Sequence, residues 1–171
     1  LNLYKFTTYG INNNDFNDYY QKILHIKPFF LRGYPSAIFL FAEYFQNNNL
    51  KPGFKLKAIF TTSEMLFPKQ RLLIEKVFNC SVFDTYGVND GAINAFECSN
   101  NNGFHIDSER GLMEVVDEQG IGIIDKQGKI LGTTLEEKCM PLIRYDTGDL
   151  GVIKDEYCLC GNEKLILKTL Q

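Results

Sequence analysis

The chain has 171 residues, of which 44% are hydrophobic and 13% aromatic, and its net charge is −3. This composition excludes a disordered protein, and the length is sufficient for one medium-sized domain or two small ones. The charge is spread along the sequence without a basic run, which argues against nucleic acid or an anionic membrane surface as a partner. No apolar stretch reaches the roughly 18 residues that a membrane span needs.

The N-terminal residues lack an initiator methionine and the charged and apolar regions of a signal peptide. These features predict a cytoplasmic protein and a chain that begins inside a longer one. The number of cysteines is odd, which favours reduced thiols, some of them metal ligands, over a disulfide framework. The five cysteines are Cys80, Cys98, Cys139, Cys158 and Cys160.

Strands and helices are expected to alternate in the first half of the chain. The hydrophobic periods and the helix-breaking residues between them predict strands at 4–8, 29–31, 56–61 and 81–83, and helices at 15–27, 36–47 and 68–78. The strand at 29–31 is expected to be short and buried. The apolar residues expected to point inward from the second and third helices are Ile38, Leu40, Phe41, Phe45, Leu72, Leu73, Val77 and Phe78. This alternation predicts a parallel sheet with right-handed crossovers.

The second half of the chain has short β-prone segments separated by glycines and hairpin-like turns. These segments lie at 95–98, 103–106, 112–116, 121–124, 130–134, 142–144 and 151–153. They predict an antiparallel sheet or a distorted barrel. The expected fold class is therefore α/β, with a nucleotide-binding subdomain at about 1–90 and a β-rich subdomain at about 91–171.

Two segments resemble each other and are expected to form turns at strand ends. The first, Phe83–Gly91, offers the aromatic ring of Tyr86 and the carboxylates of Asp84 and Asp90, and the second, 141–149, ends in Asp149. Open α/β sheets bind ligands at such strand ends. We predict that the two turns face each other across one nucleotide-sized site, although each motif alone is also compatible with an ordinary turn.

The chemistry of these side chains suits a nucleotide. A base can stack on the ring of Tyr86, and the carboxylate of Asp84 can accept a hydrogen bond from an exocyclic amine. The carboxylate of Asp149 can accept from ribose hydroxyls, and Asp90 offers the hard oxygen that Mg²⁺ prefers. A nucleotide with its magnesium ion is thus the predicted ligand.

A second set of residues has the chemistry of a metal site. Cys98 and His105 form one pair in the β-rich half, and Cys158 and Cys160 form the other. Thiolate and imidazole ligands in a group of four suit tetrahedral Zn²⁺, and such a closed site is structural. Free, half-buried cysteines beside a hydrogen-bonded histidine are the alternative.

These motifs, in this order, resemble those of the adenylate-forming superfamily. The resemblance is strongest to its phenylacetate–coenzyme A ligase and CapK-like branch and covers nearly the whole chain from about residue 20. It rests on five short motifs, which are Gly33-Tyr34-Pro35-Ser36, Thr62-Ser63-Glu64, Tyr86-Gly87-x-x-Asp90, Arg144-Tyr145-Asp146-Thr147-Gly148-Asp149 and Cys158-Leu159-Cys160-Gly161.

The resemblance implies a function for the parent protein. Members use ATP to activate a carboxylic acid as an acyl-adenylate, and many then transfer the acyl group to a thiol, often coenzyme A. By position, the ATP/AMP-binding residues are Ser63, Glu64, Asp84, Thr85, Tyr86, Gly87 and Asp149. Asp90 is the catalytic Mg²⁺ ligand at a position where the family usually has glutamate, so it is one methylene shorter.

The family's phosphate loop and its C-terminal lid domain lie outside this sequence. We therefore expect the chain to be part of a ligase and to be inactive by itself. The resemblance also allows a homodimer and a role in polysaccharide biosynthesis. The first competing hypothesis is a non-catalytic, zinc-stabilised binding domain, or a degenerate remnant, that keeps the same scaffold. The second is a generic α/β protein that binds another ligand at its sheet edge. Arg144 is either an active-site cation or an ion-pair partner of Asp146 or Asp149.

Overall fold

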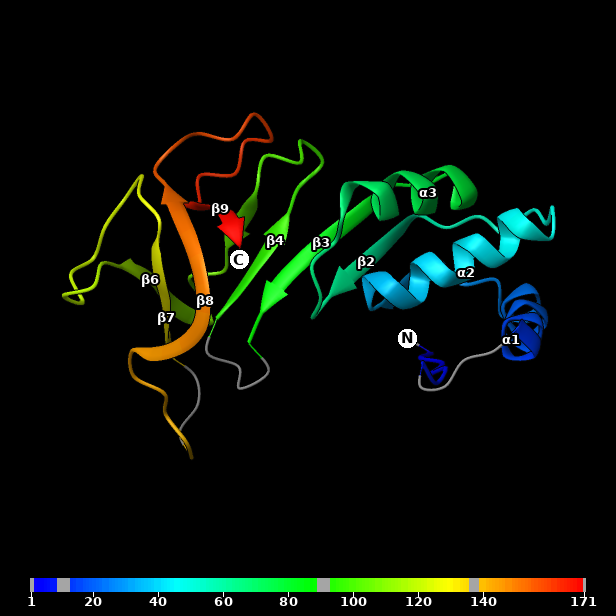
Figure 1. Ribbon diagram of the computed structural model, residues 1–171, viewed down its shortest axis with the longest axis horizontal. Coiled ribbons are helices and arrows are strands. Elements are labelled where there is room, and N and C mark those ends of the chain that lie inside the picture. Colours follow the sequence, from blue (N-terminus) through cyan, green and yellow to red (C-terminus); the bar gives the residue numbers. More distant parts are fainter. Residues whose placement is uncertain (1, 9–12, 89–92, 136–138, 171) are drawn as a thin grey trace. The chain divides into compact units, whose positions relative to one another are not determined.

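The computed structural model describes residues 2–8, 13–88, 93–135 and 139–170, which fall into two compact units at 1–82 and 83–171. The first unit contains α1 (Asn13–Ile26), β1 (Phe30–Gly33), α2 (Pro35–Asn47), β2 (Ala58–Thr62) and α3 (Pro68–Phe78) (Figure 1). β1 and β2 pair in parallel, in the register Phe30 to Ala58. The helix–strand alternation predicted for the first half is confirmed.

The two proline-initiated helices of the first unit pack against each other. Pro35 and Pro68 occupy the first helical turn, where a missing N–H costs nothing because that group has no partner within the helix. Asn79 caps the end of α3, and its φ of 49° is a left-handed conformation that asparagine tolerates well. The sequence therefore specifies both helix starts and the end of α3 locally.

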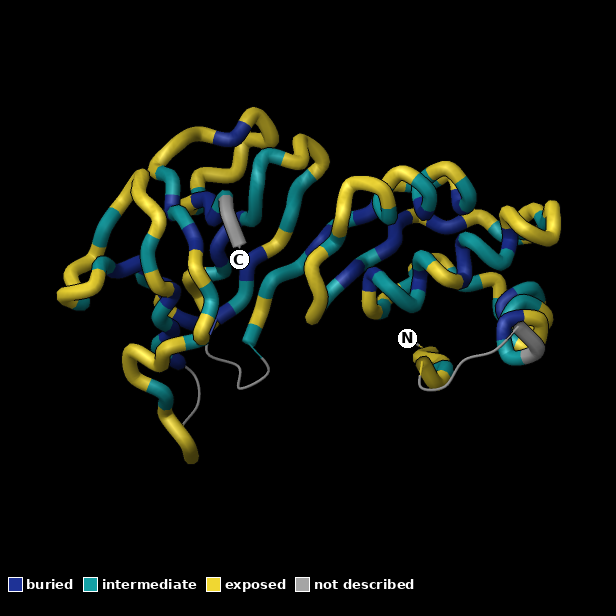
Figure 2. Tube along the Cα trace, viewed as in Figure 1, coloured by how far each residue is buried: buried dark blue, intermediate teal, exposed yellow. Residues whose placement is uncertain are grey.

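Aromatic side chains form much of the core of the first unit. The ring of Phe45 lies 4.9 Å from that of Phe41 and 5.4 Å from that of Phe78, in edge-on arrangements that aromatic quadrupoles favour. Ile59 of β2 and Ile74 of α3 are fully buried in the same cluster. Figure 2 shows these buried segments where the helices approach β2.

Three sequence predictions for this unit are wrong. Residues 4–8 form no regular strand. The strand at β1 exists, but it is not buried, because Phe30 is 48% exposed. Leu40 and Leu72 are 47% and 69% exposed, since each lies two positions from the buried residues Ile38 and Ile74 and so points away from the core face.

The second unit is an antiparallel sheet in the order β3-β4-β5-β9-β8-β7-β6. Its strands are β3 (Val82–Gly87), β4 (Asn94–Glu97), β5 (Phe104–Ile106), β6 (Gly111–Val116), β7 (Gly128–Thr134), β8 (Tyr145–Lys154) and β9 (Ile166–Leu170). A separate apolar core, which includes Ile93, Ile130 and Leu167, lies in this unit. The predicted antiparallel β-rich half is confirmed.

The boundary between the two units lies between residues 82 and 83, about eight residues before the position near residue 90 expected from the sequence. The physical reason is the pairing of β3 with β4, which ties the Tyr86 segment to the antiparallel sheet.

The positions of several strands also differ from those expected from the sequence. Residues 121–124 contribute only a bridge from Gly122 to Val116, residues 142–144 precede β8, and β9 was not anticipated. Among the described residues, every helix is too short or too polar to cross a membrane.

Candidate functional site

The two segments singled out in the sequence meet in the second unit. The hydroxyl of Tyr86 donates a hydrogen bond to Oδ2 of Asp149 over 2.8 Å, across 63 residues of sequence. The two residues come from β3 and β8, which are not neighbours in the sheet order. The sequence analysis assigned the base of a nucleotide to Tyr86 and the ribose to Asp149. The structure joins these two side chains by a direct hydrogen bond.

β3 places two predicted site residues on the same side of the strand. Asp84 and Tyr86 are separated by one residue, and successive side chains of a strand point to opposite faces. Asp84 is only 8% exposed, and its Oδ1 accepts a hydrogen bond from the backbone N–H of Thr85 at 3.1 Å. The backbone N–H of Asp84 donates to Oε2 of Glu97 on β4 at 2.7 Å. The sequence analysis did not single out Glu97. The feature that could have indicated it is the position of its carboxylate directly before Cys98.

Gly87 closes β3 where the chain leaves the sheet beside β4. A Cβ atom placed on Gly87 would lie 2.5 Å from Oδ1 of Asn94, its partner in the β3–β4 register. A side chain at this position would therefore force Asn94 to move. The absence of a side chain next to Tyr86 also lets another molecule approach the backbone closely.

Asp149 lies in a bulge rather than in the turn that the sequence suggested. β7 and β8 pair at Lys129–Leu150 and again at Leu131–Asp146, so the residues 147–149 lie opposite Ile130 alone. Gly148 has a φ of 81°, and the hydroxyl of Thr147 donates to the carbonyl oxygen of Ile130 at 3.0 Å. Bulges of this kind redirect a side chain out of the normal strand alternation. Here the bulge directs Asp149 to Tyr86.

The hydrogen bond between Tyr86 and Asp149 leaves acceptor capacity for a ligand. A carboxylate has two oxygens with about four lone-pair sites, of which this bond uses one. Burial raises the pKa of Tyr86 above its usual value, so the phenol stays protonated and acts as the donor. The pair can thus present a ring for stacking and a carboxylate for hydroxyl donors.

Two predicted nucleotide residues lie in the first unit, at the end of β2. Ser63 has a φ of 68°, and the adjacent Glu64 accepts a hydrogen bond from the backbone N–H of Ser36 through Oε2 at 3.1 Å. Ser36 is in the first turn of α2, where the helix dipole favours a carboxylate. This contact joins two of the sequence motifs, Tyr34-Pro35-Ser36 and Thr62-Ser63-Glu64.

Asp90, which the sequence analysis predicted to bind Mg²⁺, lies outside the residues that the structure describes.

Arg144 takes neither of the partners that the sequence suggested. Its Nε lies 3.2 Å from Oε2 of Glu114, and its guanidinium also donates to the carbonyl oxygen of Gly120 at 2.8 Å. Its backbone N–H donates to the hydroxyl of Thr133 at 2.9 Å, and its φ is 48°. These contacts hold the start of β8 against the β6–β7 part of the sheet, which is a structural role.

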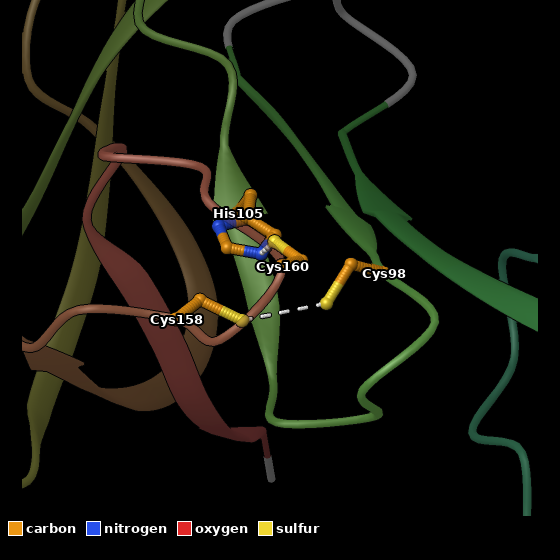
Figure 3. Close-up of side chains that lie close together, drawn as sticks. All are labelled: Cys98, His105, Cys158 and Cys160. Carbon is orange, nitrogen blue, oxygen red and sulfur yellow. Dashed lines mark hydrogen bonds between the residues drawn. The ribbon is translucent and has the colours of Figure 1, made fainter.

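The four predicted metal ligands come together in the second unit (Figure 3). Cys98 follows β4, His105 lies on β5, and Cys158 and Cys160 lie in the connection between β8 and β9. The sulfurs of Cys98 and Cys158 are 3.5 Å apart, and Sγ of Cys160 lies 3.4 Å from Nε2 of His105. All four donor atoms lie within 4.8 Å of one another.

The separations of 3.5 and 3.4 Å are close to those expected around a tetrahedral metal. With Zn–S bonds of about 2.3 Å and Zn–N bonds of about 2.0 Å, tetrahedral angles give S···S and S···N separations of about 3.8 and 3.5 Å. His105 is buried, and its Nδ1 has no hydrogen-bond partner among the described residues. Nε2 is the ring nitrogen that faces the sulfurs, so it is the atom that would hold a metal.

The backbone of the β8–β9 connection favours a thiolate at this cluster. The pKa of the Cys158 thiol is lowered to about 6, with a hydrogen bond from the backbone N–H of Cys160 as the largest cause. The N–H of Gly161 donates to the carbonyl oxygen of Cys158 at 3.0 Å, and Gly161 has a φ of 81°. The tight turn therefore needs glycine after Cys160, as the motif Cys158-Leu159-Cys160-Gly161 provides.

A cavity of about 730 Å³ lies elsewhere, in the first unit, between the N-terminal segment and α1. Its lining includes Tyr4, Lys5, Tyr19, Lys22 and His25. None of the predicted nucleotide or metal residues lines it. The cavity is therefore not part of the predicted nucleotide site or of the predicted metal site.

Comparison with known proteins finds sequence similarity to the protein CapK and to a coenzyme A ligase. No protein-family model matches the sequence. The chain is 29% identical to the protein CapK of Staphylococcus aureus over 157 residues, which cover 91% of this chain and 33% of CapK. It is 44% identical to a phenylacetate–coenzyme A ligase of Thermus thermophilus over 61 residues, 34% of this chain and 14% of the ligase.

The fold matches that of solved ligases. A structure of 2-hydroxyisobutyryl-CoA ligase in complex with 2-HIB-AMP and CoA superimposes with a TM-score of 0.81 at 23% sequence identity. The match covers 95% of this chain and 37% of the ligase. The chain thus spans about a third or less of the length of the relatives that it matches.

Proposed function

Because the chain belongs to the adenylate-forming ligase superfamily and spans only part of each member that it matches, we propose that it supplies the adenosine-binding part of an ATP-dependent, carboxylic acid-activating ligase. The observation that carries this proposal is the contact of Tyr86 with Asp149 at 2.8 Å. This contact brings an aromatic ring and a carboxylate, one for a base and one for a ribose, into a single site.

In this proposal the adenine ring stacks on Tyr86. The carboxylate of Asp84, on the same side of β3, accepts a hydrogen bond from the exocyclic amine of the base. The ribose hydroxyls donate to Asp149, while Thr85 and Gly87 contribute backbone that approaches the nucleotide. Stacking on an aromatic side chain contributes about 1–3 kcal/mol per base in nucleic-acid complexes.

The remaining residue assignments rest on the sequence motifs alone. By those motifs, Ser63 and Glu64 are predicted to contact the adenine, and Asp90 is predicted to bind a Mg²⁺ ion. The substrate is a small carboxylic acid, which reacts with ATP to give an acyl-adenylate and pyrophosphate. Coenzyme A is the proposed thiol acceptor, because two of the matched proteins are coenzyme A ligases and one contains 2-HIB-AMP and CoA.

We further propose that Zn²⁺ fills the cluster of Cys98, His105, Cys158 and Cys160. Four protein ligands close a tetrahedral site, so the metal would be structural and would leave no position for substrate. It would fix the β4–β5 hairpin to the β8–β9 connection. Structural zinc contributes about 10–16 kcal/mol in small zinc-finger peptides, which have almost no core of their own. The second unit has an apolar core that includes Ile93, Ile130 and Leu167, so the metal would add to its stability without being required for its folding.

A non-catalytic, zinc-stabilised binding domain is the second candidate. The clustering of all four ligands is compatible with this candidate, because a structural metal can stabilise the scaffold whether or not catalysis occurs. Both candidates include the adenosine site, and they differ in whether the parent chain releases pyrophosphate. We predict no pyrophosphate release by this chain alone. A cytoplasmic location, a homodimer and a role in polysaccharide biosynthesis remain predictions.

Calorimetric titration with AMP and ATP, with and without Mg²⁺, tests the adenosine site. We expect the chain to bind AMP, and we expect the Tyr86→Ala, Asp149→Ala double variant to lose this binding. A matched control is the Tyr4→Ala, Asp155→Ala double variant, which removes an exposed tyrosine and an exposed aspartate elsewhere. Equal AMP binding by both double variants would refute the proposed site.

Metal analysis of protein purified without added zinc tests the cluster. We expect about one equivalent of zinc in the unchanged chain and in a Cys139→Ser variant, because Cys139 is exposed and lies outside the cluster. A Cys98→Ser, Cys160→Ser variant should contain far less. Unchanged metal content in that double variant, or substoichiometric zinc in the original chain, would contradict the assignment.

A further inference from the structure

Glu97 holds the backbone of β3 at Asp84. The N–H of Asp84 donates to Oε2 of Glu97 at 2.7 Å. This distance is at the short end of the usual range for N–H···O bonds, as expected for a charged acceptor. The contact is local to the second unit and lies within the pair of strands that carries Tyr86.

The position of this bond explains why a side chain is needed. The backbone pairs of β3 and β4 run from Gly87–Asn94 to Thr85–Phe96, where the regular pairing ends. Asp84 is the next residue along β3, and Glu97 is the next residue along β4. The carboxylate of Glu97 therefore extends the attachment of the two strands by one residue beyond the backbone pairs.

The carboxylate of Asp84 is oriented by the same arrangement. Asp84 is 8% exposed, and its Oδ1 is held by the backbone N–H of Thr85. With its own N–H fixed by Glu97, Asp84 is constrained through both its backbone and its side chain. A carboxylate held in this way can accept from a 6-amino group of a purine but repels the carbonyl oxygen of a 6-oxo purine.

We propose that Glu97 is a positioning residue that sets the purine selectivity of the adenosine site, by holding Asp84 where it meets the exocyclic amine. This inference rests on the proposed function, because it requires adenine to bind beside Tyr86 and Asp84. Sites that hydrogen-bond a ligand group discriminate strongly against analogues that lack it, provided that the protein group is fixed in place.

Titration with AMP and inosine monophosphate, which carries a carbonyl in place of the 6-amino group, tests the proposal. We expect the unchanged chain to prefer AMP by about tenfold, the effect of one hydrogen bond to a charged group. Glu97→Ala should reduce the preference to about twofold or less, mainly by weakening AMP. Glu97→Gln, which keeps an acceptor oxygen, should restore most of it. Glu118→Ala, which removes an exposed carboxylate in a turn, is the control.

Amide hydrogen exchange at Asp84 gives a readout that does not depend on nucleotide. Exchange should be faster in Glu97→Ala than in Glu97→Gln, with exchange in the core of β7 unchanged. If Glu97→Ala does not fold, Glu97→Asp replaces it, because this change withdraws the acceptor by one methylene and keeps the charge.

The outcomes separate this inference from the proposed function. If the unchanged chain binds neither nucleotide, the proposed adenosine site fails and this inference fails with it. If the chain binds AMP but the variants keep the same preference over inosine monophosphate, only the role of Glu97 is overturned. Loss of both nucleotides in equal proportion would show a general structural effect and would also overturn it.

Discussion

Tyr86 on β3 is paired with Ala95 on β4, and this strand leads within three residues to the thiol of Cys98. The next strand, β5, pairs with β4 and carries His105. One pair of strands therefore supports the candidate stacking residue and ends at a candidate metal ligand. A metal bound at the cluster would restrain the strand on which the position of Tyr86 depends.

Metal removal is accordingly expected to weaken nucleotide binding. We predict that chelation lowers AMP affinity about fivefold, at the lower end of typical coupling between sites, and that added zinc restores it. Calorimetry before chelation, after chelation and after zinc addition measures the effect. In a Cys98→Ser, Cys160→Ser variant the chelator should change little. Unaltered affinity in metal-free protein would show that the two sites are independent.

The ring and the hydroxyl of Tyr86 are expected to contribute differently. Tyr86→Ala removes the stacking surface and should cost about 1–3 kcal/mol of AMP binding free energy. Tyr86→Phe keeps the ring and loses the hydroxyl with its hydrogen bond to Asp149, so the affinity should stay within about threefold of the original. A Phe variant as weak as the Ala variant would indicate that the hydroxyl, rather than the ring, is essential.

Replacement of Asp149 should affect the sugar rather than the base. Asp149→Asn weakens the acceptor, so we expect AMP affinity to fall about tenfold while binding of 2′,3′-dideoxyadenosine monophosphate changes little. Titration of both nucleotides measures the difference. The exposed Asp155 is the control site, and Asp155→Asn should leave both affinities unchanged. Equal losses for the two nucleotides would argue against a ribose contact.

Arg144 is expected to contribute to stability and not to chemistry. Arg144→Ala removes an exposed ion pair with Glu114 and a hydrogen bond to Gly120, which together contribute about 1–2 kcal/mol. The thermal midpoint should fall by about 2–6 °C relative to Arg110→Ala, which removes an exposed arginine of the same unit. A large loss of AMP binding in a folded Arg144→Ala variant would instead indicate an active-site cation.

Cys80 should make stability depend on pH at the alkaline end. Burial raises the pKa of the Cys80 thiol to about 11, and the carboxylate of Glu75 adds to the shift. Because an unfolded cysteine ionises near about 8.5, the contribution of Cys80 is fully present below that pH and is lost as the pH rises towards 11.

Unfolding free energies measured between pH 8 and 11 check this dependence. They should fall more steeply for the original chain than for Cys80→Ala. Cys139→Ala, at an exposed position, is the matched control and should behave like the original. Parallel curves for the original chain and Cys80→Ala would contradict the prediction.

The sequence by itself determined the class of fold and the positions of the helices. Hydrophobic periods, helix-starting prolines and breaking residues are local signals, so α1, α2 and α3 were predicted within a few residues. The alternation of these helices with β1 and β2 predicted the α/β half for the same reason. The candidate metal ligands were also identified from residue type alone, since few residues other than cysteine and histidine bind zinc.

Tertiary structure alone decided which residues meet. The contact of Tyr86 with Asp149 depends on a bulge in β8, and the role of Glu97 depends on where the pairing of β3 and β4 ends. The exposure of Leu40 and the existence of β9 likewise depend on neighbours distant in sequence. Pairing register and burial depend on contacts between remote segments, and a pattern read over neighbouring residues does not specify these contacts.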